Sequence, residues 1–181
     1  EAGPAMKKGA ERPLSAGMAE GWKKALRNEV EGREFYRMAA ANARLDGVRQ
    51  VFTFLMEEEE RHREALLERM GRTAGGGPVR VVRKPAGKKA GEFRGPLFPP
   101  DFVASGMAVD REAAALSIGM TLEKRSILQY TVLRRKSQGD AGAQTFFDDL
   151  IAWEREHLEL LARQYARLRE IFWEEARFWP F

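Results

Sequence analysis

Apolar residues recur every three or four positions through four long stretches of the chain, which is the spacing of one face of an α-helix. The pattern predicts helices over about residues 18–44, 47–71 and 111–138, and a last helix from about residue 141. Each helix has one inward-facing stripe. In chain order the stripes are Trp22, Ala25, Glu29, Gly32, Tyr36, Ala39 and Ala43; Val51, Phe52, Leu55, Glu59, His62, Leu66 and Met70; Leu116, Gly119, Glu123, Ile127, Tyr130 and Leu133; and Phe147, Leu150, Glu154, His157, Leu161, Gln164 and Leu168.

The links between these helices are short, long and short. Each short link ends in an aspartate, Asp46 or Asp140, that is expected to cap the next helix. The long link includes residues 72–100, which are rich in glycine, proline and basic side chains and predict an irregular crossover. After it we expect a short helix over Asp101–Met107, with Asp110 capping the next long helix. This order predicts an all-α, antiparallel four-helix bundle of two helix pairs, whose second and third helices run parallel.

The two ends of the chain differ from the bundle. Residues 1–17 are rich in Gly, Ala, Pro and Lys, and we expect a flexible tail before one domain spanning residues 18–181. The aromatic-rich stretch Ile171–Phe181 either continues the last helix or forms a short fifth helix. Its rings either pack on the bundle or contact a second copy of the chain, and an anchor at a lipid interface is the lesser alternative.

Composition narrows the chemistry. The 181 residues are 44% hydrophobic and 32% charged, which suits one domain rich in amphipathic helix. No apolar run approaches the ~20 residues of a membrane span, and no secretory signal pattern opens the sequence, so we expect a cytoplasmic location. The sequence has no cysteine. Disulfides, thiolate catalysis and cysteine-held iron centres are therefore excluded within these residues.

Both histidines of the chain stand three residues after a glutamate, in the pairs Glu59 and His62, and Glu154 and His157. Positions i and i+3 of a helix lie about 60° apart, so the two side chains of each pair project from one face. Two such motifs on two helices, with one glutamate from each of two other helices, form the ligand plan of di-iron and di-manganese carboxylate bundles.

The other two glutamates come from an internal repeat. Glu29 is followed seven residues later by Tyr36, and Glu123 is followed at the same spacing by Tyr130. The Glu-x-x-His motifs begin 23 and 24 residues after those tyrosines. Because each tyrosine shares a face with its glutamate, we expect both tyrosines to orient carboxylates. The predicted metal ligands are Glu29, Glu59, His62, Glu123, Glu154 and His157.

Charge favours two metal ions at this site. Four carboxylates buried together would have strongly raised pKa values unless cations balanced them. Carboxylate oxygens with one imidazole per ion suit iron or manganese, with zinc as an alternative. A plain bundle with solvated glutamates accounts for one Glu-x-x-His motif, but not for a doubled set facing inward.

At these residues the chain resembles the rubrerythrin-like branch of the ferritin superfamily. The similarity rests on Asn28–Tyr36, Glu58–His62, Glu123–Tyr130 and Glu154–His157, and extends over residues 18–170. It implies a ferritin-like fold with a di-iron centre bound by the six residues above, bridged by the glutamates of the two Glu-x-x-His motifs. It also implies reduction of hydrogen peroxide or dioxygen, coupled to oxidation of the irons, as protection against oxidative stress.

Two features depart from that family pattern. Rubrerythrin proper carries a rubredoxin-like domain held by cysteines, so electrons would here come from an external donor such as a rubredoxin-type protein, or from Fe(II) itself. Ser126 stands where rubrerythrin proper has an extra glutamate. Two functions therefore stay open: a di-iron oxidoreductase of the peroxidase or ferroxidase type, and an iron-binding or iron-handling protein without peroxidase turnover. The complete ligand set argues against a third, an interaction module with a vestigial site.

The remaining partners are inferred from charge and from the family. The net charge of +4 is modest, and the basic side chains of residues 72–100 form either a solvated loop or a docking surface for an acidic electron-transfer protein. Nucleic acid is the less expected partner of this segment. For the bundle as a whole we expect a homodimer.

Overall fold

The computed structural model describes residues 16–75 and 109–175. These residues form four α-helices, and no strand occurs among them. The helices are α1 (Ala16–Asn42), α2 (Asp46–Gly75), α4 (Val109–Lys136) and α5 (Ala141–Glu175). This confirms the predicted all-α four-helix bundle, with helix bounds within a few residues of those expected.

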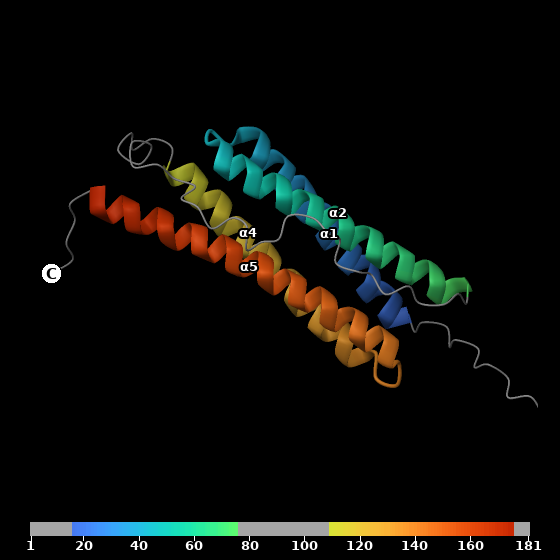
Figure 1. Ribbon diagram of the computed structural model, residues 1–181. Coiled ribbons are helices and arrows are strands. Elements are labelled where there is room, and N and C mark those ends of the chain that lie inside the picture. Colours follow the sequence, from blue (N-terminus) through green and yellow to red (C-terminus); the bar gives the residue numbers. More distant parts are fainter. Residues whose placement is uncertain (1–15, 76–108, 176–181) are drawn as a thin grey trace, which may run out of the picture.

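The helices lie lengthwise beside one another as two hairpins (Figure 1). Helix α1 packs on α2, α4 packs on α5, and the main contact between the hairpins is that of α1 with α4. The turn between α1 and α2 lies at one end of the bundle and the turn between α4 and α5 at the other. Helices α2 and α4 consequently run in the same direction, as predicted from the long link between them.

The turn before α5 is built as the sequence predicts. Gly139 has a positive φ of 90°, a backbone conformation that glycine adopts without steric cost. Asp140 follows it, and Oδ1 of Asp140 accepts a hydrogen bond of 2.8 Å from the backbone amide of Ala143. Asp140 therefore satisfies one of the free amides at the start of α5, which is the role of a helix cap.

The other two aspartates do not precede their helices, and both capping predictions are wrong. The carbonyl of Leu45 accepts the first backbone bond of α2, from the Arg49 amide at 2.9 Å, so Asp46 already lies inside the helix. Its carboxylate instead pairs with the Arg49 side chain at 2.7 Å. Helix α4 begins at Val109, so Asp110 is also inside its helix. A carboxylate in the first turn of a helix is stabilised by the helix dipole, which makes such a residue resemble a cap in the sequence.

Two buried apolar clusters fill the bundle, one toward each end. The first includes Tyr36, Phe52 and Leu116, and the second includes Trp22 and Phe147. On every helix, buried polar residues separate the residues of the first cluster from those of the second. These are the glutamates and histidines of the four stripes, so a polar layer lies between two apolar regions.

Of the segments predicted outside the bundle, the structure describes only the start of the aromatic-rich stretch at any length. Helix α5 continues through Glu175, so the aromatic-rich stretch extends this helix at least to that residue. The expected Asp101–Met107 helix, most of the basic crossover and nearly all of the N-terminal tail lie outside the described residues. Among the four described helices, none combines the length and apolar character needed to cross a membrane.

Removing the cap of α5 should destabilise the bundle measurably. We expect Asp140→Ala to lower the free energy of unfolding by about 1 kcal/mol, because the Ala143 amide loses its acceptor. Asp140→Ser should recover most of this, since a serine hydroxyl also caps. Asp140 also pairs at 3.2 Å with Arg69, whose side chain is only 5% exposed, so any loss that remains in Asp140→Ser measures this ion pair. Urea unfolding of the three proteins measures the effect.

Asp148→Ala is the matched control for this prediction. Asp148 pairs with Arg134 at 2.5 Å and its side chain is 50% exposed, but it stands inside α5 rather than before it. Its substitution should change the free energy of unfolding by less than about 0.5 kcal/mol. Equal losses in Asp140→Ala and Asp148→Ala would contradict the capping role.

Candidate metal centre

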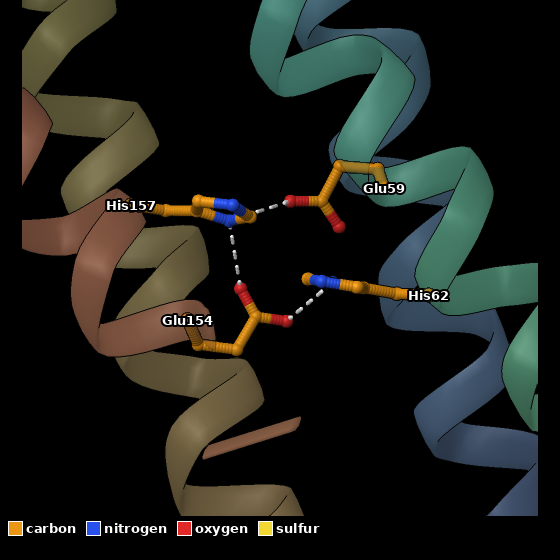
Figure 2. Close-up of side chains that lie close together, drawn as sticks. All are labelled: Glu59, His62, Glu154 and His157. Carbon is orange, nitrogen blue, oxygen red and sulfur yellow. Dashed lines mark ion pairs between the residues drawn. The ribbon is translucent and has the colours of Figure 1, made fainter. Parts of the chain in front are cut away.

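Four side chains from α2 and α5 converge at the centre of the bundle. Glu59 and His62 project from α2, and Glu154 and His157 project from α5, toward a common point between the two helices (Figure 2). All four are buried, and one potential ligand atom from each lies within 4.8 Å of the others. The two Glu-x-x-His motifs, 95 residues apart in the chain, thus form one cluster that could bind metal.

Glu154 lies between the two histidines. Its Oε1 is 3.2 Å from Nδ1 of His62, and its Oε2 is 3.4 Å from Nδ1 of His157. The two imidazole rings are nearly parallel, with centroids 5.3 Å apart and an angle of 17° between their planes. Each oxygen of Glu154 therefore faces a different histidine, which is the placement required of a carboxylate that bridges two ions.

The glutamates of α1 and α4 complete two matching halves. Oε2 of Glu29 is 3.3 Å from Nδ1 of His62. Oε2 of Glu123 is 3.9 Å from Nδ1 of His157, and Oε1 of Glu59 is 4.0 Å from the same nitrogen. The structure thus brings all six predicted ligands into one buried cluster, with one histidine and one glutamate of the same hairpin in each half.

The two tyrosines reach across the bundle rather than to the glutamates of their own helices. The Tyr36 hydroxyl donates a hydrogen bond to Glu123, and the Tyr130 hydroxyl donates one to Glu29. Seven residues of helix span about 10 Å, so a tyrosine lies too far along the axis from the glutamate of its own helix. Because α1 and α4 are antiparallel neighbours, each tyrosine instead lies level with the glutamate of the other helix. Both tyrosines are fully buried.

Burial and mutual repulsion oppose negative charge in this cluster. Desolvation, reinforced by the neighbouring Glu154 carboxylate, raises the pKa of Glu59 and of Glu123 well above the ordinary value. Burial pushes the pKa of Glu154 upward, but the positive charge of His62 and the polar contacts with Glu123 and His157 together hold that pKa below its usual range. In the absence of metal, Glu59 and Glu123 therefore retain protons that cations would otherwise replace.

The two histidines respond to the same surroundings in opposite directions. Burial alone would lower the pKa of His62, but Glu154 and Glu29 raise it to about 10. Burial lowers the pKa of His157, and its contacts with Glu154 offset this only in part. One imidazole is thus charged and the other neutral at neutral pH when no ion is bound.

The cluster also leaves buried polar atoms without hydrogen bonds. These atoms are Oε2 of Glu29, both nitrogens of His62, both carboxylate oxygens of Glu154 and Nδ1 of His157. Buried polar atoms are nearly always satisfied, because an unmade bond costs about 1–3 kcal/mol per group. Here the unsatisfied atoms converge and are oxygen and imidazole nitrogen, the donors that iron, manganese and zinc accept. The residues therefore fit a two-ion site.

Two glycines make room for the cluster. A Cβ atom on Gly32 of α1 would lie 3.2 Å from the Glu59 carboxylate, and one on Gly119 of α4 would lie 3.2 Å from the Tyr36 hydroxyl. Both contacts are closer than a side chain normally tolerates. The missing side chains at Gly32 and Gly119 are therefore what lets Glu59 and Tyr36 reach their positions.

Two side chains at the site were not anticipated from the sequence. Glu58 belongs to the acidic run 57–60, which resembles a solvated helix face, yet it is buried and its Oε2 lies 3.8 Å from Nε2 of His157. Trp153 stacks on His62, with ring centroids 5.4 Å apart and an interplanar angle of 11°. Each immediately precedes the glutamate of a Glu-x-x-His motif, so their shared place in the repeat was the signal that could have identified them.

Comparison with known proteins agrees with this architecture. A family model described as Rubrerythrin matches residues 22–165, a span that begins in α1, ends in α5 and contains all six clustered residues. No curated protein matches the chain.

The space opened by Gly32 should be needed for metal binding. We expect Gly32→Ala to weaken Mn²⁺ binding about 10-fold or more, because its methyl group would displace the Glu59 carboxylate. The metal-free fold should lose little stability, since alanine favours a helix over glycine by ~1 kcal/mol. Calorimetric titration with Mn²⁺ and thermal unfolding measure the two effects.

Gly71→Ala serves as the control for that substitution. Gly71 lies in α2, and a Cβ atom there would meet nothing within 4 Å. This variant should gain the same helix stability and bind Mn²⁺ as the unmodified protein does. Equal Mn²⁺ affinity in both variants would contradict the proposed role of Gly32.

The shifted pKa values predict opposite pH dependence with and without metal. Groups whose folded pKa is raised stabilise the fold at low pH, and that stability is lost as the pH rises toward the folded pKa. Glu59, Glu123 and His62 are such groups. The unfolding temperature of the metal-free protein should thus decrease as the pH is raised from about 7 to about 9. Bound Mn²⁺ should remove this decrease, and its affinity should increase as the pH rises, because the ligands lose their protons. Thermal scans check this, and parallel pH profiles with and without Mn²⁺ would contradict it.

Proposed function

The chain belongs to the rubrerythrin family, and we propose that it is a non-haem di-iron carboxylate protein that oxidises a ferrous pair with hydrogen peroxide or dioxygen. The observation that carries this proposal is the buried cluster of four glutamates and two histidines, arranged as two matching halves around Glu154. Its unsatisfied oxygen and nitrogen atoms are the donors that such ions require.

We assign one ion to each half of the cluster. Glu29 and His62 would hold the first ion, and Glu123 and His157 the second. The remaining two glutamates, Glu59 and Glu154, would bridge them. The contacts of each Glu154 oxygen with a different histidine, and the pairing of each histidine with the glutamate of its own hairpin, support this assignment. Iron is the proposed metal, with manganese and zinc as alternatives that the same donors accept.

The proposed reaction needs electrons from the bound metal and correctly oriented carboxylate ligands from the protein. Two bound ferrous ions would supply one electron each, and hydrogen peroxide would accept both electrons with two protons to leave two water molecules. Tyr36 and Tyr130 would keep Glu123 and Glu29 oriented, because their hydroxyls donate to those carboxylates. Burial first, and the neighbouring carboxylates next, raise the pKa of both tyrosines well above the ordinary value, so each Oη retains its proton at neutral pH.

A specific observation favours the second function, iron binding or ferroxidase chemistry without repeated turnover. Ser126 lies on α4 one turn after Glu123 and is buried, so a short hydroxyl occupies the place where the family resemblance expects another carboxylate. The 181 residues also contain no cysteine to hold an electron-donating iron centre. Turnover would therefore depend on an external donor, for which a rubredoxin-type protein is our proposal.

The proposed assembly rests on exposed apolar side chains. Ile118, Leu128 and Val132 are exposed apolar side chains on one side of α4, and they support the proposal of a homodimer. A cytoplasmic location stays a prediction from the sequence. The basic crossover lies outside the described residues, so docking of a donor there, and the absence of nucleic-acid binding, stay predictions as well.

The central test is iron stoichiometry and oxidation. Protein loaded with Fe(II) without oxygen should bind about two irons per chain and oxidise both when peroxide or oxygen is added, as followed by absorption spectroscopy. Glu154→Ala should lose this iron, because it removes the carboxylate between the histidines. Glu57→Ala is the control, since the Glu57 side chain is 54% exposed and forms only a 3.6 Å ion pair with Arg61 on the outside of α2.

The outcomes separate the alternatives. No bound metal in the unmodified protein would refute the di-iron proposal. Bound iron that is oxidised once, but is not re-reduced by reduced rubredoxin through further cycles, would favour the iron-handling function over the peroxidase.

A further inference from the structure

The two halves of the site have matching ligands but different groups behind their histidines. The residue that precedes the glutamate of each Glu-x-x-His motif is Glu58 in α2 and Trp153 in α5. Each reaches across the bundle to the histidine of the other helix. The repeat thus places a carboxylate behind one imidazole and an indole ring beside the other.

His157 is the imidazole with a carboxylate behind it. Its Nδ1 faces the oxygens of Glu154 and Glu123, so Nε2 is the nitrogen directed away from the ligand cluster. Oε2 of Glu58 lies 3.8 Å from that Nε2. The other oxygen of Glu58 accepts a hydrogen bond from Arg61, which holds the carboxylate in place. A movement of about 1 Å by either side chain would complete a hydrogen bond from Nε2 to Glu58.

His62 has different surroundings. Trp153 lies flat against its ring, and among the described residues its Nε2 has no hydrogen-bond partner. An indole face offers no lone pair to this N–H group. The imidazole of His62 is therefore positioned by packing, whereas that of His157 has an anionic acceptor within reach.

We propose that Glu58 makes the two ion positions unequal, so that the position of Glu123 and His157 fills first and the position of Glu29 and His62 fills second. This inference rests on the proposed two-ion site. A carboxylate that accepts from the outer nitrogen of a histidine fixes the tautomer whose inner nitrogen carries the lone pair, and it makes that lone pair more basic. Loss of such a partner commonly costs about 10–100-fold in metal affinity. Glu58 is thus a positioning residue for His157.

Titration with Co²⁺ tests the inequality directly. Calorimetry of the unmodified protein should show two binding steps that differ at least about 10-fold in affinity. Glu58→Gln keeps the shape of the side chain but removes its charge, and it should weaken the first step about 10–100-fold while leaving the second unchanged. Glu57→Gln removes the same charge one residue earlier, from a side chain that is 54% exposed, and should alter neither step.

Crystals grown with one equivalent of Co²⁺ locate the first ion. Anomalous scattering should place it beside His157 in the unmodified protein and divide it between both positions, or move it beside His62, in Glu58→Gln. Thermal unfolding of metal-free Glu58→Gln should match that of Glu57→Gln, which separates positioning from a general loss of structure.

The failures are distinguishable. Two equal binding steps, a first ion beside His62 in the unmodified protein, or an equal weakening of both steps by Glu58→Gln would overturn the inference and leave the two-ion site intact. Absence of any Co²⁺ binding would overturn the two-ion site, and the inference with it.

Discussion

The burial of four carboxylates at the centre of the bundle is the constraint on which the rest of the structure depends. The six clustered residues are at most 3% exposed, although ionised side chains are strongly disfavoured away from water. The apolar clusters on either side supply the stability that this polar layer removes. Without cations the layer holds protons instead, as the raised pKa values of Glu59 and Glu123 show. The fold therefore maintains a site whose negative charge has to be balanced, either by protons or by bound cations.

Reciprocal tyrosine contacts connect the site to the architecture. Tyr36 and Tyr130 join α1 to α4 through the glutamates of the opposite helix, so the same bonds that orient two carboxylates also set the two hairpins in register. A sliding of one hairpin along the other would break both bonds at once. The geometry of the site and the packing of the hairpins therefore depend on the same two hydrogen bonds. A rigid scaffold of this kind is what a preorganised metal site requires.

The sequence was sufficient for whatever depends on helical periodicity. The four stripes, the six clustered residues and the cap at Asp140 follow from spacing and local turn chemistry, because these are properties of one helix at a time. The partners of the tyrosines were not predictable in this way, since they depend on which antiparallel helix lies level with each ring. Glu58 was missed because the acidic run 57–60 resembles a solvated face, although Glu58 lies only about 40° around the helix from His62. Its side chain reaches His157 on a neighbouring helix and is buried.

Because the two halves of the site have the same set of ligands, any difference between them has to come from neighbouring residues. In the proposed two-ion site, changing Glu154 would alter the charge balance for both ions, because its two oxygens face different histidines. The position before each Glu-x-x-His motif lies outside the ligand set, yet it touches the outer side of a histidine. It can therefore tune one half while the ligands of both halves remain matched. In the proposed site, a carboxylate at one such position and an indole at the other would give two similar donor sets unequal basicity, and the two ions would then differ in affinity without any change of ligand.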